Sequence, residues 1–140
     1  MAINTGKVVT GGLLAGVVFN AFDMLWNYTV LAADMEAFAR RVNLDPAIMT
    51  DFSYAIPWIV VDFLFGLLVV WNYAAIRPRF GPGPKTAIYA GLVPYFGVLL
   101  VMYGFTSMGV FTMDLWMKQA VLALITTVVG SVAGAWAYKE

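Results

Sequence analysis

Three polar side chains, Asn20, Asp23 and Asn27, interrupt an otherwise apolar run between Gly11 and Leu31. In an α-helix, their spacing of three and then four residues places them on one face. An ionisable group at the centre of a membrane helix costs about 2.5–3.5 kcal/mol on insertion scales, so it usually has a partner or a function. Asp23 could bind a proton or a cation, and the two amides could form hydrogen bonds between helices.

Other polar residues in apolar segments extend this stripe into a candidate cluster. Asp114 follows Thr112 at a predicted helix start, where a carboxylate also favours the helix dipole. Lys118 could reach the lipid headgroups or pair with Asp114, four residues earlier. A buried Asp–Lys pair that only specifies packing explains Asp23 about as well as a proton or ion site does. The full candidate cluster is Asn20, Asp23, Asn27, Asp62, Tyr103, Asp114 and Lys118.

The composition is that of a membrane protein. Of the 140 residues, 62% are hydrophobic and 11% are charged, against about 25% charged residues in soluble domains. The net charge is zero, so nothing favours a nucleic-acid partner, and the lipid bilayer is the expected surrounding. The absence of Cys and His excludes thiol catalysis, histidine-ligated haem, His-rich zinc sites and a Ser-His-Asp triad, and no cofactor is predicted.

The apolar runs predict one transmembrane domain over residues 1–140, an all-α bundle of four helices. A span needs about 20 mostly apolar residues, and the period-two alternation of membrane strands is absent. A short helix lying flat at the interface is expected between the first two spans, at about 34–44, with Met35 and Phe38 on its apolar side. The predicted spans are about 8–32, 55–76, 86–105 and 112–138.

The connections predict where the helices begin and end. Asp45 and Pro46 have the pattern of an N-cap followed by proline at the first helical position, so the second helix is expected to begin before it enters the membrane. The breaker-rich segment 77–84 predicts a loop, and segment 104–110 predicts a tight turn.

Basic residues predict the orientation. Five lie on the side of the termini, and two, Arg40 and Arg41, lie on the other side. An excess of Lys and Arg marks cytoplasmic loops, so both termini are expected in the cytoplasm. The five on the terminal side are Lys7, Arg77, Arg79, Lys85 and Lys139.

Small residues predict how the helices pack. Gly12 and Gly16 in the first span, and Gly130 and Gly134 in the fourth, lie toward the terminal side, and small residues four apart allow close helix contact. We expect the first and fourth helices to cross closely there and to diverge outward. The gap would then hold Asn20, Asp23, Asn27, Asp62 and Lys118 in a wet pocket open to the outside.

Methionines form a second pattern. Met108, Met113 and Met117 are close in sequence, and thioethers are soft ligands suited to Cu(I). The interpretation that we favour is that they fill irregular apolar gaps, so no metal site is predicted.

The two ends of the chain resemble those of small uncharacterised bacterial proteins with four transmembrane helices. The resemblance rests on Gly-Gly-Leu-Leu-Ala-Gly at 11–16, followed by Asn20 and Asp23, and on the ending 134–140. It implies a bacterial inner membrane and carries no activity with it.

Two functions remain. The first is a non-catalytic accessory or structural subunit that packs against membrane protein partners or copies of itself. The alternative is a small oligomeric transporter or channel that uses Asp23, Asp62 and Lys118 as a proton or ion site. An enzyme that acts on a lipid is less favoured, because no nucleophile–base pair is identifiable from spacing.

Overall fold

The computed structural model describes residues 3–138, and in this range the chain is helical throughout, without strands. Four helices are long and apolar enough to cross a membrane, which confirms the predicted four-span bundle and makes the chain a multi-pass membrane protein. Lys139 and Glu140, which entered the sequence arguments, lie outside the described residues. The elements are α1 (Thr5–Tyr28), α2 (Ala32–Arg41), the 3₁₀-helix η1 (Pro46–Met49), α3 (Phe52–Phe80), α4 (Pro84–Ser107) and α5 (Met113–Ala137).

Capping residues set the boundaries that differ from the sequence expectation. Asp45 does cap a helix, but only the short η1, and a second cap at Asp51 begins α3. The helix α3 also continues through Pro78 to Phe80, where a loop was predicted. It ends at Gly81, whose φ of 82° is a left-handed conformation that other residues adopt with strain.

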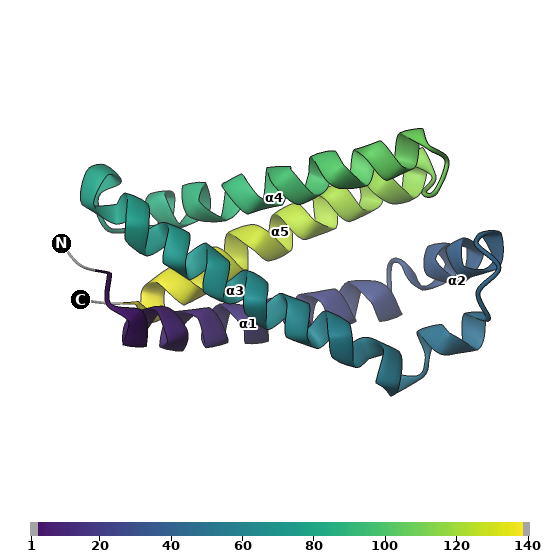
Figure 1. Cartoon of the computed structure of the whole chain (residues 1–140), viewed down its shortest axis with the longest axis horizontal. Coiled ribbons are helices and arrows are strands. Elements are labelled where there is room, and N and C mark those ends of the chain that lie inside the picture. Colours follow the sequence, from purple (N-terminus) through teal and green to yellow (C-terminus); the bar gives the residue numbers. More distant parts are fainter. Residues whose placement is uncertain (1–2, 139–140) are drawn as a thin grey trace.

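The helices form two hairpin-like pairs. Figure 1 shows α4 and α5 running side by side, while α1 and α3 cross each other and meet α5 near the end that carries both termini. The helix α2 lies at the opposite end, beyond the tips of α1 and α5. We call the end that carries both termini the terminal end, and the end that carries α2 the α2 end.

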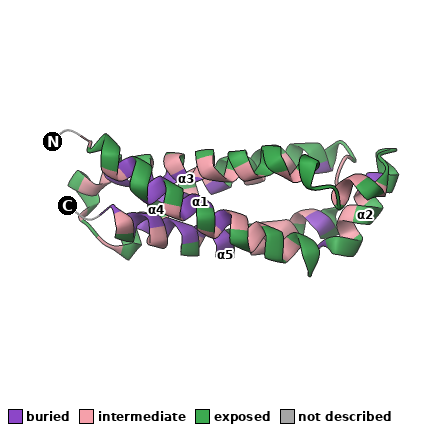
Figure 2. Ribbon diagram, turned by 90° about the horizontal axis from the view of Figure 1, so that it is seen from below, coloured by how far each residue is buried: buried purple, intermediate pink, exposed green. Residues whose placement is uncertain are grey.

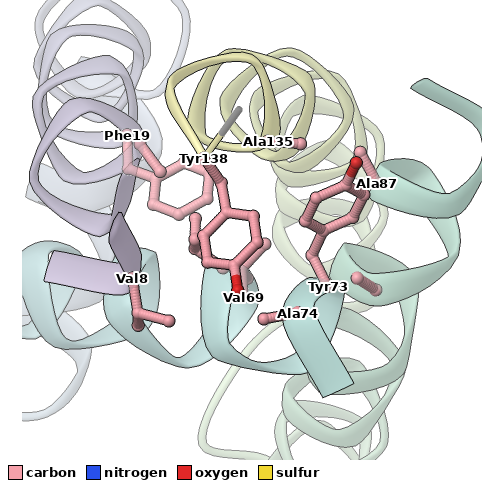
Figure 3. Close-up of a cluster of buried hydrophobic side chains, with 11 residues drawn as sticks. Val8, Phe19, Val69, Tyr73, Ala74, Ala87, Ala135 and Tyr138 are labelled. Atoms are coloured by element: carbon pink, nitrogen blue, oxygen red, sulfur yellow. The ribbon is translucent and has the colours of Figure 1, made fainter. Parts of the chain in front are cut away.

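The core occupies the terminal end. Figure 3 shows its buried side chains, which include Val8, Phe19, Val69 and Tyr73. Toward the α2 end, burial falls: the last buried residue of α1 is Phe19, and the first of α3 is Gly66. Figure 2 shows the same gradient along the molecule. Close packing of α1 and α3 is therefore confined to the terminal end, whereas Ala39 of α2 and Leu115 of α5 are buried at the α2 end.

Glycines bring the helix backbones together in this core, although with partners that differ from the expected ones. Gly12 and Gly16 lie against α3, at Leu67 and Phe63, and not against α5. The contact of α1 with α5 is made one position earlier, where a Cβ at Gly11 would lie 2.6 Å from the carbonyl oxygen of Gly134. Adjacent residues point about 100° apart on a helix, so two neighbouring glycines serve two different partners.

Gly130 and Gly134 do pack against α1, as expected. The ring of Phe19 covers Gly130, and Gly134 lies against Ala15 and against Val70 of α3. The predicted close approach of the first and fourth spans at the terminal end is therefore present, with Gly11 and Ala15 supplying the α1 side.

Candidate functional site

Asp23 and Asp62 form the most unusual contact in the molecule. Their side chains, on α1 and α3, are in hydrogen-bonding contact with each other. Ionised carboxylates are only acceptors, so this contact is a hydrogen bond only when one of the two groups carries a proton. The pair is thus a place where a proton can be held between two helices.

The helical register places both carboxyl groups on the stripes that form the core. Asp62 lies four residues before Gly66 and seven before Val69, both of which are buried. Asp23 lies four residues after the buried Phe19. Both carboxyl-bearing residues are half-buried, because they stand just beyond the point at which close packing stops.

Asn20 and Asn27, the other members of the stripe on α1, have different hydrogen-bond partners. The amide of Asn20 donates to the carbonyl oxygen of Gly16, at 2.9 Å, and to that of Ile59 on α3, at 3.3 Å. It therefore joins the two helices, as interhelical amides are expected to do. The amide of Asn27 donates to the carbonyl oxygen of Asp23 on its own helix, and its side chain is exposed.

The predicted cluster divides into two, because Lys118 pairs elsewhere. Its ammonium group lies 3.0 Å from a carboxylate oxygen of Asp34 on α2, and 2.8 Å from one of Asp114. In the part of the chain that is described, its ion pairs are with these two residues and not with Asp23 or Asp62. The hypothesis of a structural Asp–Lys pair at Asp23 is therefore wrong.

Tyr103 and the methionines lie outside both the Asp23–Asp62 contact and the ion pairs of Lys118. Tyr103 is half exposed and packs edge-on against Trp116, with ring centroids 5.3 Å apart. Met108, Met113 and Met117 are all exposed, at 77%, 47% and 51%. Over residues 3–138, no three Asp or Glu side chains converge as a metal site would require.

The helix α2 packs against the bundle through part of its apolar side. The ring of Phe38 stacks on that of Phe111, with centroids 5.1 Å apart. The guanidinium of Arg41 donates to the carbonyl oxygens of Gly109 and Val110, the latter at 2.7 Å. The predicted interfacial helix exists, at Ala32–Arg41, but its Phe38 contacts the α4–α5 turn.

A pocket of about 290 Å³ lies beneath α2, at the start of α5. Its wall combines charged and apolar side chains, and the two acidic residues in it are the partners of Lys118. The lining residues are Asp34, Ala37, Phe38, Arg41, Thr112, Asp114 and Leu115.

Sequence reasoning missed three contributors: Asp34, Arg41 and Thr126. The hydroxyl of Thr126 accepts a hydrogen bond from the indole of Trp26, at 3.0 Å, and so joins α1 to α5 beyond the core. Asp34 and Arg41 were assigned to an interfacial segment, and only the docking of α2 on α5 reveals their partners. The sequence does show Asp34 as a carboxylate in a short predicted helix. Which residue it pairs with depends on how that helix docks on α5.

The arrangement places two half-buried carboxyl groups in contact between α1 and α3, and a separate ionic contact at the α2 end. No family model, no curated protein and no solved structure matches this chain.

Proposed function

We propose that this chain is a non-catalytic structural or accessory subunit of a bacterial inner membrane, which associates with membrane protein partners or with copies of itself. One observation carries the proposal: α1 and α3 are buried at the terminal end, and their other halves are left open. In α1, no residue after Phe19 is buried, and in α3 none before Gly66 is buried.

The open halves carry side chains suited to contact with another helix. Met24 on α1 is 48% exposed, and Trp58 and Leu64 on α3 are 71% and 58% exposed. Asn27, whose exposed side chain donates within its own helix, lies three residues after Met24, and polar groups in membranes favour helix association. A neighbouring chain packed here would complete the burial that the four helices begin.

Cysteine cross-linking in native membranes tests this proposal, because the chain has no cysteine of its own. Single replacements Met24→Cys and Leu64→Cys report on the open half. Leu100→Cys on α4, 69% exposed, is a matched control for an apolar membrane position. We expect oxidation to give specific cross-links, to a second copy or to a partner, at Met24 and Leu64 but not at Leu100. A protein that purifies as a monomer, without cross-links, contradicts the proposal.

The orientation is part of the same proposal. Lys7, Arg77, Arg79 and Lys85 belong to the terminal end, whereas Arg40 and Arg41 belong to the α2 end. The positive-inside rule then favours cytoplasmic termini. Labelling Ala33→Cys on α2 with a membrane-impermeant thiol reagent in intact cells tests it, and protection of this residue would contradict it.

A second candidate function follows from the Asp23–Asp62 contact. Two carboxyl groups in contact on the core stripes, with Lys118 engaged elsewhere, support a proton-binding site in a small transporter or channel. Four helices rarely enclose a pathway alone, so this function also needs an oligomer.

Proton flux into proteoliposomes, measured with an internal pH dye under an imposed potential, tests the second candidate. Asp62→Asn should abolish the flux, whereas Asp114→Asn, a carboxylate change at the helix start, should leave it. Flux that survives both Asp62→Asn and Asp23→Asn excludes the pair as its site.

A further inference from the structure

The helix α2 is connected in a way that suits a movable element. Segment 29–31 precedes it and segment 42–45 follows it, and neither is helical. Asn43 in the second segment has a φ of 58°, which non-glycine residues adopt infrequently. The helix is thus a ten-residue unit between two short connectors.

Along one face, α2 holds the opposite helix pair by several contacts. Asp34 pairs with Lys118, the thioether of Met35 lies 4.0 Å from the amide of Gln119, and Phe38 stacks on Phe111. Arg41, one turn further on, donates to the carbonyl oxygens of the α4–α5 turn. This contact face recurs every three to four residues, the spacing of one side of a helix.

These contacts differ in strength from those at the terminal end. There, glycines place α1 and α5 backbone against backbone, and the core around Val69 and Val70 is fully buried. At the α2 end, the side chains of Lys118 and Asp34 are 42% and 25% exposed, and exposed ion pairs contribute little and are screened by salt. The terminal end is joined by buried packing, whereas at the α2 end the ion pair is partly exposed and burial is limited to a few residues such as Ala39 and Leu115.

We propose that α2 is a releasable strap, which holds the α4–α5 pair against the α1–α3 pair at one end while the Gly11–Gly134 contact acts as the hinge at the other. Release of the strap, together with loss of the Trp26–Thr126 hydrogen bond between α1 and α5, lets the α2 ends of the two pairs separate. The gap beside the half-buried Asp23 and Asp62 then widens from that end. This inference concerns motion within one chain and is independent of the proposed function.

Distances between spin labels test the strap, again because there is no native cysteine. One label pair, Ala33→Cys on α2 with Val121→Cys on α5, reports on the strap. A second, Ala75→Cys on α3 with Val129→Cys on α5, reports on the hinge end. All four positions are exposed. The perturbing variants are Arg41→Met and Lys118→Met, alone and combined.

Arg40→Met is the matched control. It removes the same charge from the same helix, but Arg40 pairs with Glu36 within α2 and not with the bundle. Because variants can fail to fold, the Ala33–Val121 label distance is also measured in about 1 M salt in the protein that keeps Arg41 and Lys118. At this salt concentration the screening length falls to about 3 Å.

We expect the perturbing variants and high salt to add a population in which the strap pair is longer by about 10 Å, one helix diameter, while the hinge pair is unchanged. Arg40→Met should give the distribution of the parent protein. The proposal is overturned if the strap distance is the same in the double variant and in high salt, if Arg40→Met lengthens it equally, or if the hinge pair shifts as well.

Discussion

Asp23 on α1 and Asp62 on α3 face each other in hydrogen-bonding contact, one turn beyond the residues at which the core packing stops. No third charged group of the described chain is bonded to them, whereas Lys118 forms ion pairs with both Asp34 and Asp114 at the α2 end. The Asp23–Asp62 contact is a hydrogen bond only when one carboxyl group carries a proton, whereas opposite charges join Lys118 to its two partners at the α2 end.

The proton in this pair can be replaced by an amide. Asp62→Asn supplies an N–H donor to Asp23, so we expect the thermal stability in detergent to be unchanged or higher. Asp62→Ala leaves the half-buried Asp23 without its partner, and we expect a loss of about 1–3 kcal/mol. Equal losses for the two variants would show that the carboxyl–carboxyl contact contributes nothing to the fold.

The glycine contact between α1 and α5 should be the most sensitive point of the bundle. A methyl group at Gly11 would meet the carbonyl oxygen of Gly134 at 2.6 Å, so Gly11→Ala should destabilise the protein by about 1–3 kcal/mol in detergent unfolding. Gly97→Ala on α4 is the control, because a Cβ there meets nothing within 4 Å. A Gly11→Ala protein as stable as the Gly97→Ala protein would show that the helices separate easily at this point.

The four spans could be predicted from the sequence because the length of an apolar run is a local property that can be read without knowing the fold. Sequence patterns also predicted that Asp23 and Asn20 meet other helices, since polar residues on an apolar stripe need partners. The partner of each could not be predicted. Gly12 faces α3 whereas Gly11 faces α5. Which glycine faces which helix depends on how α1 is rotated about its axis, and the sequence does not determine that rotation.

The same limit applies to Lys118. Its sequence neighbours predict the pair with Asp114, four residues earlier, and the structure confirms it. The second partner, Asp34, is 84 residues away in the chain and reaches Lys118 only because α2 docks on α5. The amphipathic pattern of α2 fits a lipid surface and a protein surface equally well, so the sequence could not select between them.

Removal of two different hydroxyl groups on α5 is expected to have opposite effects on stability. The Ser131 hydroxyl is buried against Gly91 and has no hydrogen-bond partner within the described residues, so Ser131→Ala should maintain or raise the unfolding temperature. The Thr126 hydroxyl accepts from the Trp26 indole, so Thr126→Ala leaves that N–H unpaired and should cost about 1–3 kcal/mol. Thermal unfolding of the two variants in one detergent makes the comparison, and a reversed order would contradict this assignment of partners.

Asp51 gives the start of α3 a pH dependence. Its carboxylate accepts from the backbone N–H of Ser53 and from the Ser53 hydroxyl, and these bonds, the backbone one foremost, lower the pKa of Asp51. Because the folded-state pKa is lowered, the cap is complete above the ordinary value of about 3.9 and is lost as the pH falls through the lowered one. The amide proton shift of Ser53, followed by NMR in detergent, should therefore titrate below the ordinary Asp value. Asp51→Asn keeps an acceptor without a titrating charge and should remove the transition, and a midpoint at or above the ordinary value would show that the cap does not form.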